Sequence, residues 1–139
     1  MSESMQGSCL CKAVTVSVTP SKLHVDACHC TICRTWGGGP MFAIGELQDF
    51  QLKGSEHVSV YHSSEWAKRG FCRHCGTHLY FHLNDQDQYL VPAGLVAGDH
   101  PLAFNMEVFI EEKPAFYEFA NPTQKLTGEE LFKLYSGQA

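Results

Sequence analysis

Residues 71–83 read FCRHCGTHLYFHL, which joins a pair of cysteines to an apolar run. Cys72 and Cys75 are separated by two residues, a spacing at which both thiolates can bind the same metal ion. Gly76 follows the second cysteine and can adopt the positive φ of a tight turn, so that backbone amides point at the sulfurs. The segment from Thr77 to Leu83 contains the alternating run LYFHL, which predicts a strand. The stretch therefore predicts a metal-binding knuckle that leads directly into a sheet.

Two further cysteine clusters lie nearer the N-terminus. Cys9 and Cys11 occur in GSCLC, and CHCTIC contains Cys28, Cys30 and Cys33, so that every one of the seven cysteines lies in a cluster. Thiolates at these spacings favour a soft, tetrahedral metal such as zinc. Four thiolates complete a closed structural site, whereas three leave one position open, as a catalytic zinc requires. The division of the cysteines is therefore the first indication of an enzyme.

Disulfide or redox chemistry is the main alternative for these cysteines. The odd count, the lack of an apolar secretory segment and the difficulty of bridging a Cys-x-Cys pair argue against a disulfide framework. A thioredoxin-like pair is expected at a strand-to-helix junction, whereas Cys75 leads into a predicted strand. On one face of a strand, Cys9 and Cys11 can both reach one metal together with Cys72 and Cys75, with Gly7 easing the approach. The spacing equally allows Cys72 and Cys75 to join the middle cluster instead.

Length, composition and net charge limit the classes of protein to which this chain can belong. The 139 residues suit one domain, predicted to span 1–139, and 44% apolar residues are enough for a core without disulfides. The net charge of −5 gives no electrostatic reason to expect nucleic acid. No apolar run approaches the length of a membrane span, so no membrane partner is expected. Reduced thiols without an export signal predict a cytoplasmic location.

The rest of the chain predicts a mainly β fold. Residues 14–19 alternate valine with serine or threonine, which predicts a half-buried strand. Other short strands are expected at 23–27, 41–44, 50–53, 58–62, 77–83, 89–91 and 104–110. Thr127 and Glu130 form a capping box that predicts a short C-terminal helix. Many short strands separated by turns favour a coiled, multi-sheet fold, with the metal clusters on the loops between strands.

The order of the motifs GSCLC, CHCTICR and FCRHCGTHLYF resembles the glutathione-dependent formaldehyde-activating (GFA) family, which shares a superfamily with centromere protein V. The resemblance covers almost the whole chain. It implies a β-tent fold with two zinc sites, a structural site of four cysteines and a catalytic site of three. The structural ligands match Cys9, Cys11, Cys72 and Cys75, and the catalytic ligands match Cys28, Cys30 and Cys33. We expect the three-cysteine site to be labile and to exchange its zinc more easily.

The activity that this resemblance implies is the addition of glutathione to formaldehyde, which gives S-hydroxymethylglutathione. This is carbon–sulfur lyase chemistry in reverse, with glutathione as co-substrate and a small aldehyde as its partner. Three thiolates neutralise the charge of zinc, so delivery of a thiolate suits the site better than strong Lewis acidity. The alternative function is a non-catalytic, zinc-stabilised module that binds a protein or nucleic-acid partner.

Basic residues beside the cysteine clusters are candidates for substrate binding. Arg34 follows the middle cluster, and Lys68, Arg69 and Arg73 flank the knuckle. An arginine can bind a glutathione carboxylate through two parallel hydrogen bonds. The same cations can instead offset the negative charge of the zinc–thiolate clusters.

Three residues have roles that the sequence leaves open. His29 lies inside the middle cluster, where it can supply a fourth ligand, donate to a sulfur, shuttle a proton or simply pack. Glu107 and Phe116 stand where the resemblance implies a histidine and a tryptophan. This departure predicts a substrate pocket that differs from the family pattern.

Overall fold

The computed structural model describes residues 3–136, and its backbone forms two compact units that are interleaved in the sequence. The first unit contains the chain up to Leu23 and the segment from Ile44 to Leu102. The second unit contains the segment from His24 to Ala43 and the chain from Ala103 onward. Among the described helices, none combines the length and apolar character needed to cross a bilayer. The single domain over 1–139 stays a prediction.

The first unit contains two antiparallel sheets. One has the strand order β1-β2-β5, and the other contains β6 to β9 with each strand paired to the next. The strands of the first sheet are β1 (Met5–Ser8), β2 (Thr15–Pro20) and β5 (Leu47–Lys53). Those of the second are β6 (Val58–Tyr61), β7 (Ala67–Cys72), β8 (His78–Leu83) and β9 (Gln88–Pro92), and the unit also has η1 (Ser55–His57) and α2 (Ala93–Val96).

The core of the first unit follows from the alternation of its strands. Every second residue of β2 is buried, including Val16 and Val18, so the valines predicted to face inward do so. Leu79 of β8 and Val91 of β9 are also fully buried. Gly7 belongs to this packing, because a Cβ there would lie 1.7 Å from the carbonyl oxygen of Leu95. The glycine therefore permits a close approach of α2 to β1, and not an approach to a metal.

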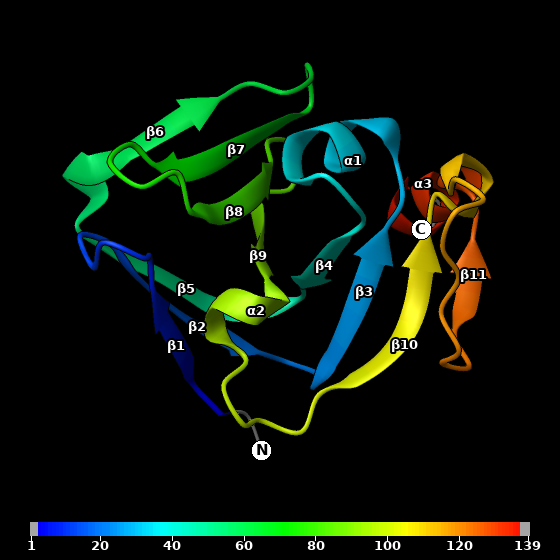
Figure 1. Cartoon of the computed structure of the whole chain (residues 1–139), viewed down its shortest axis with the longest axis horizontal. Helices are drawn as coiled ribbons and strands as arrows, with labels where there is room; N and C mark the ends of the chain where they lie inside the picture. Colours follow the sequence, from blue (N-terminus) through cyan, green and yellow to red (C-terminus); the bar gives the residue numbers. More distant parts are fainter. Residues whose placement is uncertain (1–2, 137–139) are drawn as a thin grey trace. The chain divides into compact units, whose positions relative to one another are not determined.

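The second unit contains a mixed sheet, in which β10 lies between β11 and β3 and pairs in parallel with both. Strand β3 pairs antiparallel with β4 on its other side. Figure 1 shows β3 in blue beside β10 in yellow and β11 in orange. The strands are β3 (His24–Cys28), β4 (Met41–Ile44), β10 (Ala103–Val108) and β11 (Gln124–Leu126), and the helices are α1 (Thr31–Gly37), η2 (Ile110–Glu112) and α3 (Gly128–Ser136).

The predicted fold class is confirmed, because the structure is mainly β, has several sheets and ends in a short helix. The capping box is formed as expected at that helix. The amide of Glu130 donates to Thr127 Oγ1 at 3.1 Å, and the amide of Thr127 donates to Glu130 Oε1 at 2.8 Å. These reciprocal bonds satisfy donors that the first turn of α3 would otherwise leave exposed.

Three expectations about local structure were wrong. The cysteine clusters do not all lie on loops, because Cys33 lies within α1 and Cys28 is the last residue of β3. Cys9 and Cys11 lie in the turn after β1 and not on a strand. The strand expected over 104–110 ends at Val108, because Phe109 adopts a φ of 56° and turns the chain into η2.

Candidate metal centres and the polar network beside them

The first unit gathers four cysteines into one cluster, the four-cysteine cluster. The turn after β1 supplies Cys9 and Cys11, the end of β7 supplies Cys72, and the next turn supplies Cys75. Their four sulfurs lie within 4.8 Å of one another, and Cys11 Sγ lies 3.7 Å from both Cys9 Sγ and Cys72 Sγ. A tetrahedral zinc with Zn–S bonds of about 2.3 Å requires S···S distances of about 3.8 Å. The cluster therefore fits zinc, and Cys72 and Cys75 join the N-terminal pair.

Tight turns aim backbone amides at these sulfurs. The amide of Val14 donates to Cys9 Sγ and that of His74 donates to Cys72 Sγ, both at 3.4 Å. Gly76 has a φ of 79°, as expected, and its amide donates to the Cys72 carbonyl at 2.8 Å. Amide donors stabilise the ionised form of an acceptor, so these turns favour thiolates.

Hydrogen bonding also lowers the pKa of Cys75, the fourth cysteine of this cluster. The hydroxyl of Thr77 lies 3.2 Å from Cys75 Sγ. Hydrogen bonds from the side chain and the backbone of Thr77 lower the pKa of Cys75 to about 5. These bonds favour the thiolate form of Cys75, which is the form that binds a metal, whereas its neighbours raise the pKa of Cys11 in the same cluster to about 11.

The second unit gathers the remaining cysteines into the three-cysteine cluster. Cys28 ends β3, Cys30 is the N-cap of α1, and Cys33 lies in the first turn of that helix. Their sulfurs lie within 4.8 Å of one another, and the Cys33 amide donates to Cys30 Sγ at 3.3 Å. In the part of the chain that the structure describes, no further histidine, cysteine or carboxylate belongs to this group. The cluster thus offers three sulfur ligands for a metal.

The three thiols lie so close together that they need a positive charge nearby in order to ionise together. Hydrogen bonds with Cys30 and Cys33, followed by burial, raise the pKa of Cys28 above its ordinary value. All three thiols can ionise together only if a positive charge offsets their mutual repulsion. A divalent soft metal supplies that charge, so the donor set fits zinc.

His29 is buried beside this cluster and does not face the sulfurs. Its side chain is 0% exposed, and both ring nitrogens have other partners. Nε2 lies 2.8 Å from Glu107 Oε1, and Nδ1 lies 2.7 Å from the Tyr117 hydroxyl. His29 is therefore neither a fourth ligand nor a donor to a cysteine in this structure.

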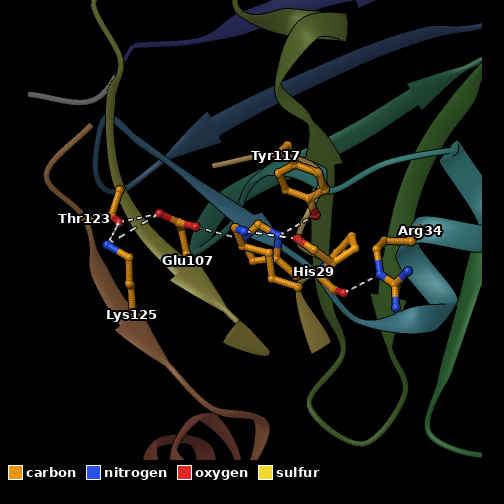
Figure 2. A network of polar contacts seen from close by, with 8 residues as sticks. His29, Arg34, Glu107, Tyr117, Thr123 and Lys125 are labelled. Atoms are coloured by element: carbon orange, nitrogen blue, oxygen red, sulfur yellow. Dashed lines mark hydrogen bonds and ion pairs between the residues drawn. The ribbon is translucent and has the colours of Figure 1, made fainter. Parts of the chain in front are cut away.

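Glu107 anchors the other end of this network (Figure 2). Its side chain is 2% exposed and accepts a hydrogen bond from the Thr123 hydroxyl, and Lys125 Nζ lies 3.8 Å from its Oε2. Burial alone would raise the pKa of Glu107, but hydrogen bonds from Thr123 and His29 outweigh it, so that the pKa lies below its ordinary value. Glu107 is therefore a buried carboxylate that only accepts hydrogen bonds.

The loop that carries the three cysteines is also fixed from outside. Arg34 donates from Nε to the His29 carbonyl at 2.9 Å and from Nη2 to Thr31 Oγ1 at 3.3 Å. Glu112 Oε1 accepts from the amide of Thr31 at 2.7 Å and from its hydroxyl at 3.1 Å. Arg34 thus binds the cysteine loop itself, while its role toward a substrate stays a prediction.

The other predicted site residues have mixed surroundings. Arg69 is only 3% exposed, donates from Nε to Ser63 Oγ and places its guanidinium 4.8 Å from the centre of the Phe81 ring. This burial favours a structural role within the first unit. Arg73 is exposed and Lys68 is half-buried. Phe116 is 80% exposed, in contrast to the buried Glu107.

Sequence analysis did not predict the two hydrogen-bond partners of His29, Glu107 and Tyr117. Glu107 is 78 residues away along the chain, and Tyr117 is 88 residues away. The parallel register of β3 and β10 pairs Ala27 with Glu107 and so brings the carboxylate to His29. Strand β10 reads AFNMEV, in which Asn105 and Glu107 alternate with apolar residues, so the local pattern places Glu107 on a polar face and gives no signal that it is buried.

Comparison with known proteins points to one family. Residues 4–112 match the family described as glutathione-dependent formaldehyde-activating enzyme. An uncharacterized lyase of Schizosaccharomyces pombe is 37% identical over 129 residues, which cover 92% of this chain and 94% of the relative. A Halomonas elongata protein named "Putative glutathione-dependent formaldehyde-activating enzyme" is 28% identical over 131 residues, covering 86% and 83%. A crystal structure of a Rhodobacter sphaeroides protein superposes with a TM-score of 0.57 at 27% identity, covering 70% of this chain and 92% of that one.

Proposed function

This chain belongs to the glutathione-dependent formaldehyde-activating enzyme family, and from that premise we propose that it is a zinc-dependent carbon–sulfur lyase. Its substrates are adducts of a small aldehyde with glutathione or a similar thiol, such as S-hydroxymethylglutathione. The free state of all seven cysteines supports a reducing compartment, so we place the reaction in the cytoplasm.

The observation that carries the proposal is the convergence of Cys28, Cys30 and Cys33 without a fourth ligand among the described residues. These three cysteines would hold the zinc of the reaction, and the four-cysteine cluster would hold a structural zinc. A zinc with three protein ligands can take up one more ligand and, when bound, lowers the pKa of a coordinated thiol.

The reaction balances without any further reactant. In the forward direction the thiol sulfur forms a bond to the aldehyde carbon, and the carbonyl π electrons move to oxygen. The proton that leaves the thiol ends on that oxygen, which becomes the hydroxyl of the adduct. The lyase direction breaks the same carbon–sulfur bond and returns the proton to sulfur. Arg34 and Glu112 keep the three cysteines in place by binding the loop between them.

Binding of a thiol to the cobalt-substituted protein tests the proposal. Cobalt held by cysteine thiolates gives a charge-transfer absorption, and glutathione should change it, whereas S-methylglutathione, whose sulfur carries no proton, should not. In Cys30→Ser the response to glutathione should disappear, and the four-cysteine cluster should keep its own absorption.

No response to glutathione or to any small thiol would overturn the lyase proposal. It would favour the alternative, a zinc-stabilised module that binds a macromolecular partner. The lyase and the binding module also differ in whether they catalyse a reaction. Only the enzyme should speed the interconversion of glutathione, formaldehyde and their adduct, which exchange spectroscopy follows directly.

A further inference from the structure

Strand β6 lies at the edge of its sheet. It pairs with β7 on one side, and among the strands that the structure describes it has no neighbour on the other side. Figure 1 shows β6 as the outermost strand of the group from β6 to β9. An edge strand presents a row of backbone N–H and C=O groups that can pair with another chain. The residues of β6, which read VSVY, are therefore a candidate interaction surface.

The hydrogen bonds between β6 and β7 show which backbone groups of β6 point away from the sheet. The amide of Arg73 donates to the His57 carbonyl at 2.9 Å, whereas the amide of Cys72 donates away from β6, into the turn before β8. Hydrogen-bonded and non-hydrogen-bonded pairs alternate along an antiparallel ladder. Because Val58 is paired with Cys72, it occupies a non-hydrogen-bonded position, and so does Val60. These two valines therefore direct their N–H and C=O groups outward.

Strand β6 lacks the features with which proteins usually block such an edge. It contains no proline and no charged residue, and its register with β7 runs without a bulge. The side chain of Val60 is 45% exposed and that of Tyr61 is 58% exposed. The edge thus combines outward-facing backbone groups with exposed apolar side chains, so that pairing with another strand would bury apolar surface.

The sequence of β6 is complementary to itself in one antiparallel register. If two copies meet about a two-fold axis at Ser59, Val58 of each copy lies opposite Val60 of the other. These are the residues whose backbone groups point outward, so both valine pairs can exchange two hydrogen bonds each. A shift by two residues in either direction keeps only one such pair within the strands. Opposed β-branched side chains are also favourable cross-strand neighbours.

The residues that flank β6 fit the same register. Glu56 precedes the strand and His62 follows it, and both side chains are exposed. The axis at Ser59 brings Glu56 of each copy opposite His62 of the other, where an imidazole N–H can donate to the carboxylate. A carboxylate accepts several hydrogen bonds, so Glu56 can keep its 3.4 Å contact with His57 Nε2. A second copy of this chain therefore matches the edge in backbone and in side chains.

We propose that the chain forms a two-fold symmetric dimer through β6, in which the strands from β6 to β9 of both copies join into one continuous sheet. The inference concerns assembly and does not depend on the proposed lyase activity. Each copy contributes a strand of four residues, so the interface belongs to the class of small, weak contacts. The fraction of dimer should accordingly rise with protein concentration.

Disulfide crosslinking tests the register. Ser59→Cys places a thiol on the axis at a non-hydrogen-bonded pair, where the two Cα atoms lie about 4.5 Å apart, within reach of a disulfide. The zinc-loaded variant, with a dipyridyl disulfide as oxidant, should form a bond between the two introduced thiols. Peptide mapping by mass spectrometry distinguishes this bond from any that involves a native cysteine. Tyr61→Cys is the matched control, because its two thiols would lie about 13 Å apart along the strands and could not be bridged.

Sedimentation equilibrium of the zinc-loaded protein tests the interface without a crosslink. The native chain should show a monomer–dimer equilibrium. Val60→Lys should weaken the dimer at least about ten-fold, because the two-fold axis sets a lysine against Val58 twice. Leu134→Lys replaces a residue of α3 that is 56% exposed and should leave the equilibrium unchanged. If Val60→Lys does not fold, the crosslinking experiment still decides.

A charge exchange tests the flanking pairs. Glu56→Lys alone should weaken the dimer about two- to ten-fold, because both symmetric contacts with His62 lose their acceptor. Adding His62→Glu to that variant should restore the affinity, since each lysine then faces a carboxylate of the other copy. Restoration in the double variant requires that the two positions oppose each other across the axis.

The results separate this interface from any other. A native chain that stays monomeric up to its solubility limit overturns the inference, even if β6 binds an added peptide. A dimer in which Ser59→Cys forms no crosslink, or in which Tyr61→Cys is bridged instead, uses another surface or register and also overturns it. Equal weakening by Val60→Lys and Leu134→Lys has the same meaning. The response of the cobalt protein to glutathione is measured separately, so the lyase proposal stands or falls on its own test.

Discussion

The Arg34 guanidinium donates hydrogen bonds to the loop that carries the three cysteines. The contacts to the His29 carbonyl and to Thr31 use two of the five donors that an arginine has. We predict that Arg34→Ala raises the KM for glutathione about ten-fold or more, because one charge-assisted hydrogen bond to a carboxylate is lost. Steady-state kinetics with glutathione and with a small neutral thiol measures this effect.

The comparison of thiols identifies the role of Arg34. A smaller effect for the neutral thiol shows carboxylate binding, and Arg34→Lys should then restore only part of the loss, since it keeps the charge but not the planar fork. Equal impairment with both thiols, together with faster metal release, would instead assign Arg34 to the loop alone.

Glu107 should make the stability of the fold sensitive to acid. Its pKa in the folded protein lies below the ordinary value, so the carboxylate stabilises the fold while it is ionised. This contribution is present above the ordinary carboxyl pKa of about 4.3 and is lost as the pH falls through the lower pKa of the folded state. We predict that acidification destabilises the native chain more steeply than Glu107→Gln.

Urea unfolding at a series of pH values checks this prediction, with the same metal content in both proteins. Glu118→Gln serves as control, because Glu118 is exposed and should leave the slope as in the native chain. Parallel slopes for the native chain and Glu107→Gln would show that Glu107 binds protons equally in the folded and unfolded states.

The residues that the sequence could identify are those with a local signature. Cysteine spacing identified all seven residues as candidate ligands, but their division into clusters of four and three followed only from the family resemblance. Gly76 marked the turn. The partners of His29 carry no such signature, because Glu107 reaches it only through the pairing of two strands that are distant in sequence. Burial of a carboxylate is visible only when that pairing is known.

At the scale of elements, α1 depends on a cap from another part of the chain. The helix has no acidic residue in its first turn, and Glu112 of η2 accepts from its first amide instead. We predict that Glu112→Ala loosens this turn at a cost of about 1 kcal/mol, as the loss of a helix cap does. Because Cys30 and Cys33 lie at this end of α1, a chelator should remove metal from the three-cysteine cluster faster.

The neighbouring residue provides the matched control. Glu111 accepts from the amide of Gly128 at the start of α3, so Glu111→Ala should destabilise that helix and leave metal release from the three-cysteine cluster unchanged. Release from the four-cysteine cluster should not change in either variant. Equal acceleration by both substitutions would show a general loss of stability and no specific role for Glu112.

Elements were predictable where the pattern was strong and local. The alternation in β2 and the capping box of α3 led directly to the observed structure. Strand β7 was missed because AKRGFC contains a glycine and two cations. Gly70 is required there, since a Cβ would lie 2.3 Å from the Tyr80 ring, and Arg69 is buried over Phe81. Such contacts between strands override the local signal.

At the scale of the whole molecule, the two cysteine clusters lie in different compact units and should differ in their effect on folding. The four-cysteine cluster joins the turn after β1 to the turn between β7 and β8, so that a metal bound there would link two sheets of the first unit. A zinc ion held tightly there would close a long loop of the chain and so contribute directly to folding. The three-cysteine cluster joins only the end of β3 to the first turn of α1, so a metal bound there would close a short loop.

We therefore predict two zinc ions of unequal strength in the loaded protein. Metal analysis after dialysis against a chelator should find about one zinc retained, with the second released. Cys75→Ser should lower the free energy of unfolding strongly and yield a protein that misfolds, because the link between the two sheets is broken. Cys30→Ser should stay folded, keep the retained zinc and lose the labile one. If both variants unfold alike, or if both ions resist the chelator equally, the three-cysteine cluster is a second structural site and its open position has no catalytic meaning.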